Sequence, residues 1–182
     1  NTGIVKDALG TNTTGASNVA IGKDALAANT TADNNTAVGY NALLSNTTGA
    51  NNVAVGKEAL DANTTTHQNT AVGHSALGAN TASDNTAVGM RALTTNTTGT
   101  ENTAVGKDAL KLNSTGSYNT AMGNDAMLNS LGSHNAAFGY KALLSNTTGA
   151  YNVAVGDQAL EANTTGESNV ALGRFALTAN TT

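Results

Sequence analysis

The sequence predicts an all-β protein folded as a parallel β-solenoid, or β-roll, and three observations point to this fold class. A unit of about 17 residues, N-[T/V]-A-[V/I/L/M/F]-G-x-x-A-L-x-x-N-T-T-G-x-x, repeats along all 182 residues. Such a unit is too short for helical repeats, which need about 33–47 residues. Apolar residues also keep one register in successive units, which a disordered tract does not require. We therefore expect a single domain, residues 1–182, in which each coil contacts mainly its neighbours.

Eleven coils are expected, each being one copy of the unit, and together they would form a rod about 50 Å long at a spacing of about 4.8 Å. They begin at Asn1, Asn18, Asn35, Asn52, Asn69, Asn85, Asn102, Asn119, Asn135, Asn152 and Asn169. The coils that begin at Asn69 and Asn119 are one residue short, outside the segment expected to form a strand. The first coil departs at Gly3 and Val5, where the other coils have Ala and Gly.

Within a coil, the expected elements follow one another in a fixed order. The segment N-V-A-V-G, as at 52–56, alternates with a period of two residues and is typical of a strand. The segment A-L-x-x-N, as at 59–63, is expected to be a second extended piece. The corner T-T-G then closes the coil, with a glycine free to adopt positive φ. These corner glycines are Gly15, Gly49, Gly99, Gly116, Gly149 and Gly166.

Alternation along the strand predicts which side chains face the core. Valine replaces threonine at Val19, Val53, Val153 and Val170, so we expect the [T/V] and [V/I/L/M/F] columns to be buried. The alanine column would then face outward, and its small uncharged side chains indicate close packing against a second copy of the chain. The predicted oligomer interface is Ala20, Ala37, Ala54, Ala71, Ala87, Ala104, Ala121, Ala137, Ala154 and Ala171. The alternative is a very thin roll with these alanines inside.

The segments Ser17–Gly22, Asn51–Gly56 and Ser168–Gly173 resemble the S-V-A-I-G head motif of trimeric autotransporter adhesins. The longer unit from Asn35 to Gly49 is similar to tandem repeats of phage tail-fibre-like proteins. The resemblance covers essentially the whole chain, although adhesin heads use shorter repeats without a regular N-T-T corner. It implies a left-handed parallel β-roll, a homotrimer, and an extracellular place on a virion tail fibre or a cell surface. The implied function is a non-catalytic fibre shaft or head segment that serves as a stiff attachment spacer, with a cell-surface glycan or receptor as a further possible partner.

The N-T-T corner is the most suggestive surface feature. Stacked coils would align its asparagines and threonines in ladders, and the structural interpretation is that these ladders hydrogen-bond along the stack. The alternative function is an ice-binding solenoid that orders water on a threonine row. The residues of that ladder are Thr13, Thr30, Thr47, Thr64, Thr81, Thr97, Thr147 and Thr164.

Composition and spacing argue against several other functions. The net charge of −4 argues against a nucleic-acid partner, and no apolar run approaches the roughly 18 residues that insertion into a membrane requires. With no cysteine and no common spacing among His67, His74 and His134, we expect neither a metal site nor a cofactor. No set of residues with a catalytic pattern stands out from the repeat, so an enzyme is not expected. The non-periodic aromatic residues are where a glycan could stack, namely Tyr40, Tyr118, Tyr140, Tyr151 and Phe175.

Overall fold

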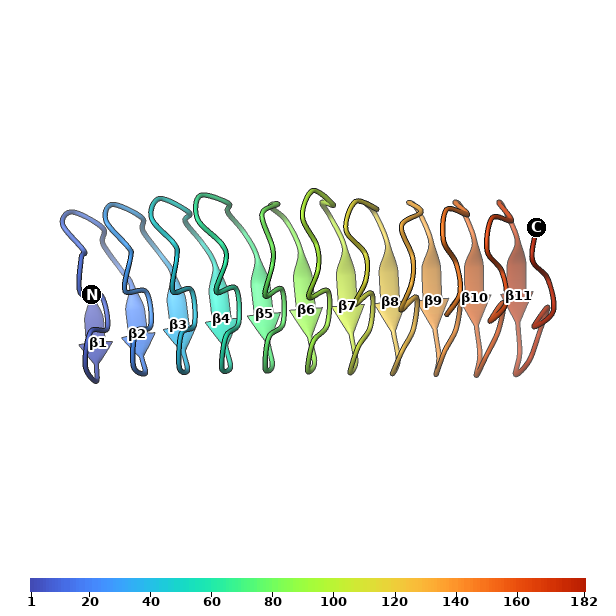
Figure 1. Cartoon of the computed structure of the whole chain (residues 1–182), viewed down its shortest axis with the longest axis horizontal. Helices are drawn as coiled ribbons and strands as arrows, with labels where there is room; N and C mark the ends of the chain where they lie inside the picture. The colour runs from blue at the N-terminus through green and yellow to red at the C-terminus, as the bar shows by residue number, and fades with distance from the viewer.

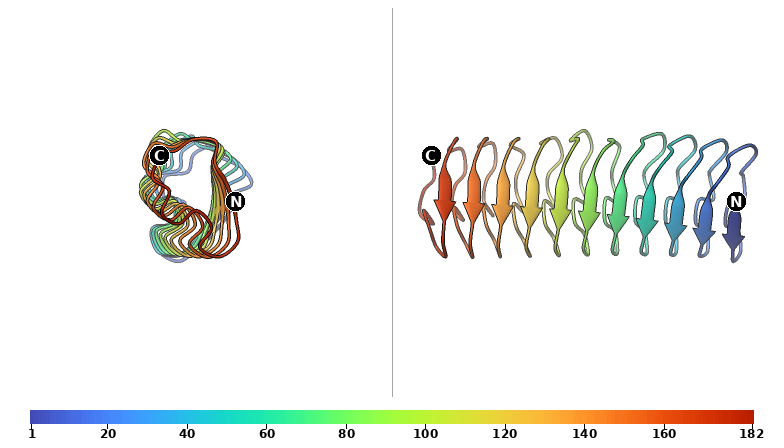
Figure 2. Two further views of the ribbon diagram at one scale, coloured as in Figure 1. Left: turned by 90° about the vertical axis from the view of Figure 1, so that its right-hand side faces the viewer. Right: turned by 180° about the vertical axis from the view of Figure 1, so that it is seen from behind.

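The computed structural model describes all residues, 1–182, and confirms the predicted fold class. The chain is a parallel β-solenoid in which each coil contributes one strand of three residues to a single sheet of eleven strands in chain order (Figure 1). The strands are β1 (Thr2–Ile4), β2 (Val19–Ile21), β3 (Thr36–Val38), β4 (Val53–Val55), β5 (Thr70–Val72), β6 (Thr86–Val88), β7 (Thr103–Val105), β8 (Thr120–Met122), β9 (Ala136–Phe138), β10 (Val153–Val155) and β11 (Val170–Leu172). Viewed along the rod, the coils lie one behind another in a closed outline with the strands on one side (Figure 2).

The sheet keeps its register through both short coils. Ala71 pairs with Ala87 across the first, and Ala121 pairs with Ala137 across the second. The residue missing from each is the second threonine of the corner. Asn80 Nδ2 donates to the Ala82 carbonyl two residues ahead, whereas Asn96 Nδ2 donates to Gly99 three residues ahead. The prediction that a turn absorbs the deletions is confirmed.

The prediction of a second extended piece at 59–63 is wrong, because this part of the coil consists of consecutive turns. Ala59 N donates to the Gly56 carbonyl and Asn63 N to the Leu60 carbonyl, three residues back in each case. Glu58 and Leu60 have φ of 57° and 52°, and a left-handed backbone cannot continue a strand. The same positive φ recurs at this position of every coil, from Leu9 to Leu177, with Met127 in one coil.

The corner glycines do not have positive φ, which corrects a second expectation. They are needed because neighbouring atoms lie very close: a Cβ on Gly49 would lie 2.5 Å from Asn46 Oδ1. The left-handed glycines are instead those that end the strands. Gly39 has φ 138°, and a Cβ there would lie 2.5 Å from the Gly56 carbonyl oxygen of the next coil.

Hydrogen bonds join the coils around their whole circumference. Of 122 backbone hydrogen bonds, only 20 lie within the strands, so the turns hold most of the remaining 102. Leu26 N, for example, donates to the Ala42 carbonyl of the next coil at 3.0 Å, and Leu43 N donates to Ala59 in the same way. A rod bonded in this way should resist bending, because separating two coils breaks many bonds at once.

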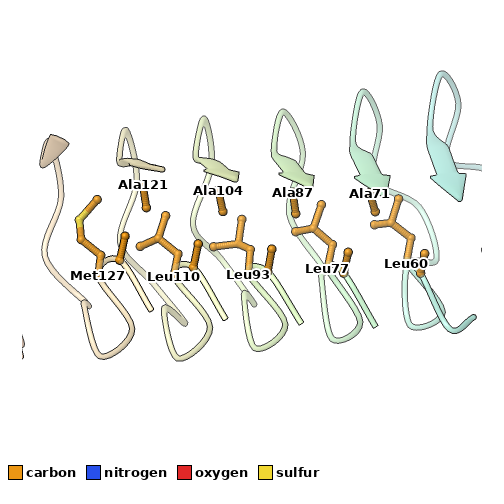
Figure 3. Packing of buried hydrophobic residues seen from close by; sticks show 14 of the residues in the cluster. Leu60, Ala71, Leu77, Ala87, Leu93, Ala104, Leu110, Ala121 and Met127 are labelled. Carbon is orange, nitrogen blue, oxygen red and sulfur yellow. The ribbon is translucent and has the colours of Figure 1, made fainter. Parts of the chain in front are cut away.

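The core is a narrow stack of alanine and leucine columns (Figure 3). The strand alanines from Ala20 to Ala154 are 0% exposed, and Ala171 is 2% exposed. The leucine column from Leu26 to Leu160, with Met127 once in place of leucine, is likewise 0% exposed. Alanine lies on the strand side because a coil of this circumference leaves no room for a larger residue opposite leucine.

Candidate interaction surface

The structure reverses the expected orientation of the strands. Because the alanines point into the coil, alternation turns the residues on either side of each alanine outward. The interface predicted at the alanine column is therefore corrected: these side chains are covered by the chain's own core and cannot meet a second copy. The alanines concerned are Ala20, Ala37, Ala54, Ala71, Ala87, Ala104, Ala121, Ala137, Ala154 and Ala171.

The outward residues form two parallel columns, which together we call the outer face. The first outward column is Thr2, Val19, Thr36, Val53, Thr70, Thr86, Thr103, Thr120, Ala136, Val153 and Val170. The second outward column is Ile4, Ile21, Val38, Val55, Val72, Val88, Val105, Met122, Phe138, Val155 and Leu172. The two columns were predicted to be buried, and that prediction is wrong for the single chain.

The outer face is uncharged and mostly apolar along its whole length. Val72 is 36% exposed, Val88 37% and Met122 42%, although each is flanked by similar residues above and below. At about 4.8 Å per coil, the face runs for about 50 Å. An exposed apolar surface that is continuous over this length is typical of an interaction site.

Charged residues lie along the two edges of the outer face, and the two edges differ in composition. The edge that follows the strands carries both signs: its first charged position has Lys6, Lys23, Lys57, Lys107 and Arg174 against Asp157, and the next position has Asp7, Asp24, Glu58, Asp108 and Asp125 against Arg91 and Lys141. The two positions that precede the opening asparagine carry acids and no lysine or arginine, with Asp33, Asp84, Glu101 and Glu167. On the edge that follows the strands, Lys23 pairs with Asp24 at 3.3 Å, and this hydrogen bond raises the pKa of Lys23.

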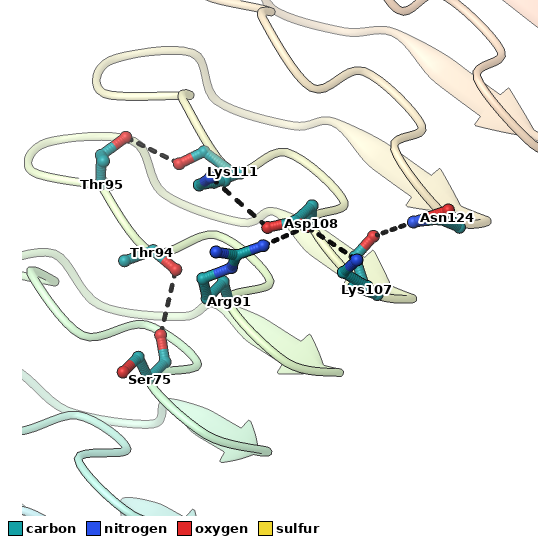
Figure 4. Close-up of polar contacts among 8 residues, drawn as sticks. All are labelled: Ser75, Arg91, Thr94, Thr95, Lys107, Asp108, Lys111 and Asn124. Carbon is teal, nitrogen blue, oxygen red and sulfur yellow. Dashed lines mark hydrogen bonds and ion pairs between the residues drawn. The ribbon is translucent and has the colours of Figure 1, made fainter.

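One ionic cluster joins two coils at the turn beyond β7 (Figure 4). The Asp108 carboxylate is nearly buried and accepts a hydrogen bond from Arg91 Nη2 at 2.7 Å, and Lys111 Nζ lies 3.6 Å from its other oxygen. The hydrogen bond to Asp108 raises the pKa of Arg91. Asp108 is the single acid of this cluster, and Lys107 Nζ lies 3.9 Å from it as a third cation; the pair with Arg91 links two neighbouring coils.

Two internal asparagine ladders confirm the structural interpretation of the repeated asparagines. At the corner, Asn46 Nδ2 donates to Asn29 Oδ1 and Asn63 Nδ2 to Asn46 Oδ1, at 3.2 Å and 2.9 Å. The opening asparagines form a second ladder, in which each backbone N–H donates to the side-chain oxygen of the preceding coil's asparagine. Both ladders are buried except at the two ends of the rod.

The hydroxyl groups of the threonine ladder considered for ice binding form hydrogen bonds within the chain. Seven of its eight hydroxyls donate to a backbone carbonyl of the next coil, as from Thr47 to Thr64 at 3.1 Å. Leu131 takes the same position in the second short coil and interrupts the row. This use of the hydroxyl protons is structural, and it leaves each oxygen able only to accept a hydrogen bond from water.

An aromatic stack borders the outer face beside β8, β9 and β10. The rings of Tyr118, His134 and Tyr151 lie one above another with centroids 4.9 Å apart and planes inclined by 22°. The sequence contained the signal, since each residue directly precedes the opening asparagine of three consecutive coils. Tyr40, Tyr140 and Phe175 lie elsewhere, each beside a cation, so the five candidate aromatic residues do not form one site.

The surface has no pocket, and no three histidine, cysteine or acidic residues gather as metal ligands. The three histidines lie apart: His67 Nδ1 accepts a hydrogen bond from Ala50 N, His74 approaches Glu58 at 3.5 Å, and His134 lies in the aromatic stack. The structure contains no helix that could cross a membrane.

Comparison of the chain with protein-family models, characterised proteins and solved structures gave no match.

Proposed function

We propose that the protein is a non-catalytic fibre segment, whose rods associate side by side through their outer faces into a stiff spacer. The observation that carries the proposal is the outer face itself. Its two columns hold no charged residue in any coil and its second column is apolar throughout, while charged residues lie at its edges and beyond. The resemblance of the repeat to adhesin heads and tail-fibre repeats supports the same function and favours three chains in an extracellular fibre.

The size of the outer face suits a stable interface. Two side-chain columns with their flanking edges span about 15 Å, which over about 50 Å gives about 750 Å². Stable protein interfaces bury about 800 Å² on each partner. The face also lacks the charged residues that the core of an interface usually excludes.

A second copy of the chain is the partner that fits best. The face repeats at every coil, so only a surface with the same spacing can match it along its full length. Another solenoid of this sequence has that spacing by construction. A glycan or receptor would then bind outside this face, for example at the exposed edges of the Tyr118–His134–Tyr151 stack.

The solution mass of the chain, measured by light scattering after size exclusion, tests the proposal. We expect a multiple of 18.0 kDa, and three copies if the resemblance holds. Val72→Lys places a charge on the outer face and should shift the mass toward that of the monomer. Leu112→Lys is the matched control, because Leu112 is 44% exposed but lies away from the strands. A monomeric unmodified chain contradicts the proposal.

Ice binding is the second candidate function. One observation favours the outer face, in place of the corner threonine ladder, as the ice-binding surface. The strand threonines, such as Thr70, Thr86 and Thr103, form regular ranks on a sheet with valine beside them, whereas the corner hydroxyls are engaged in hydrogen bonds. A face covered by another chain cannot order water. A monomer that shapes ice crystals and loses this activity in Thr86→Lys would favour ice binding over the fibre.

A further inference from the structure

Because every coil presents nearly the same outer face, the repeat alone cannot set the axial position of one copy against another. From β3 to β7 the second outward column is valine without exception. Sliding one rod by one coil, about 4.8 Å, would therefore replace each contact there by an almost identical one. A fibre built from this chain, which is the proposed function on which this inference rests, needs another feature to fix the register.

We infer that Ala136 and Phe138 of β9 fix that register, by packing Phe138 of one copy against Ala136 of a parallel neighbour at the same height. Ala136 is the one alanine of the first outward column, and Phe138 is the one phenylalanine of the second. The smallest and the bulkiest residue of the outer face thus lie in the same strand, on either side of the buried Ala137.

The symmetry of the assembly explains why these two residues would meet. When parallel rods are related by rotation about an axis along the fibre, the second outward column of one faces the first outward column of the next. The phenylalanine of one copy then fills the space left by the alanine of its neighbour. In an antiparallel pair each column would face its own counterpart in the partner, and Phe138 would find no matching gap.

A shift by one coil would lose this match. Phe138 would meet Thr120 or Val153 of the neighbour, whose larger side chains already fill the site. Ala136 would face Met122 or Val155 and leave a gap beside them. Both overpacking and cavities destabilise a packed interface. The short coils keep the strands in register, so this mismatch would not be relieved within the chain.

The charged edges support the same parallel arrangement. Glu101 precedes β7 and Lys107 follows it, and Glu167 and Arg174 flank β11 in the same order. With parallel rods at equal height, the edge that precedes the strands of one copy lies against the edge that follows the strands of the next, so Glu101 would face Lys107 and Glu167 would face Arg174. A shift by one coil in one direction would instead bring Glu167 toward Asp157, which follows β10.

Cysteine cross-linking between two variants measures the register, and the chain has no cysteine of its own. Thr70→Cys would be co-refolded separately with Val55→Cys, Val72→Cys and Val88→Cys, which lie in β4, β5 and β6. Under mild oxidation, we expect the Thr70–Val72 pair to cross-link at least about ten-fold more than either other pair. Equal cross-linking of the three pairs, or a preference for another offset, would overturn the inference.

Variants that remove the Ala136–Phe138 pair, or move it to another strand, provide the control. Ala136→Thr with Phe138→Val gives β9 the residues of its neighbours and should lower the selectivity at least about five-fold. Adding Thr36→Ala and Val38→Phe moves the pair to β3 and should restore it. Unchanged selectivity after removal would contradict the role of the pair. Light scattering separates this failure from that of the proposed function: an assembly without a fixed register refutes the inference alone, whereas a monomer refutes both.

Discussion

The asparagine ladder gives the sharpest test of how the rod is held together, and Asn102 is a suitable position. Its side chain is 1% exposed and makes two hydrogen bonds. Nδ2 donates to the Gly116 carbonyl at 2.8 Å, and Oδ1 accepts from the Asn119 backbone N–H at 3.0 Å. Gly116 keeps a second donor, Asn113 Nδ2 at 2.9 Å, when Asn102 is removed.

Asn102→Ala should cost about 2–4 kcal/mol of unfolding free energy. The Asn119 N–H would lose its partner in a buried place, which costs about 1–3 kcal/mol, and the lost bond to Gly116 adds about 0.5–1.5 kcal/mol. Asn102→Asp should cost more at neutral pH, because it sets a carboxylate oxygen against the Gly116 carbonyl. Burial would raise the pKa of this new carboxyl above its unfolded value of about 3.9, so the extra cost should vanish in acid and grow as pH rises.

Thermal unfolding followed by circular dichroism at pH 4 and pH 7 measures these effects, and hydrogen exchange at Asn119 locates them. Glu101→Ala is the matched control, since Glu101 is the exposed neighbour in sequence. The reasoning is refuted if Asn102→Ala stays within about 0.5 kcal/mol of the unmodified chain, the usual range for surface substitutions. An Asn102→Asp effect independent of pH would refute the electrostatic part alone.

Three further predictions follow from single positions. Leu77→Ala should cost about 2–5 kcal/mol in urea unfolding, because Leu77 is 0% exposed and the narrow core cannot refill the space; a cost below about 1 kcal/mol would show that the coil collapses. Val5→Gly should stabilise the first coil by about 1 kcal/mol, since Val5 has φ 88°, and slower local hydrogen exchange would reveal this gain. Asp61→Asn should stabilise the rod at pH 7 but not below about pH 4, because burial raises the pKa of Asp61 and ionisation then disfavours the fold; equal effects at both pH values in thermal unfolding would contradict this.

The sequence predicted the solenoid, the strands and the asparagine ladders, because each is written in the period of the repeat. The opening residue is asparagine in every coil, and a buried ladder is the arrangement that satisfies such a column. The deletions were also placed correctly, since strand pairing tolerates no missing residue while a corner does.

The orientation of the strands was not predictable from alternation alone. A column of alanine fits either a close interface or a narrow core, and valine in place of threonine is compatible with burial or with an exposed apolar face. The opening asparagines could have decided it, since they lie on the same side of the strand as the alanines and need buried partners. The turn at 59–63 was missed because Leu60 has φ 52°, a conformation that leucine disfavours and that the stacked coils impose.

Thiol accessibility of the outer face tests the central claim most directly, using Val88→Cys and Leu112→Cys as a pair. In the single chain the two side chains are similarly exposed, at 37% and 44%, but only Val88 lies on the outer face. The proposed association predicts that Val88→Cys reacts with a thiol reagent as fast as Leu112→Cys in very dilute protein and becomes protected at higher concentration, where the mass rises. Equal reactivity of the two cysteines at every concentration would contradict it.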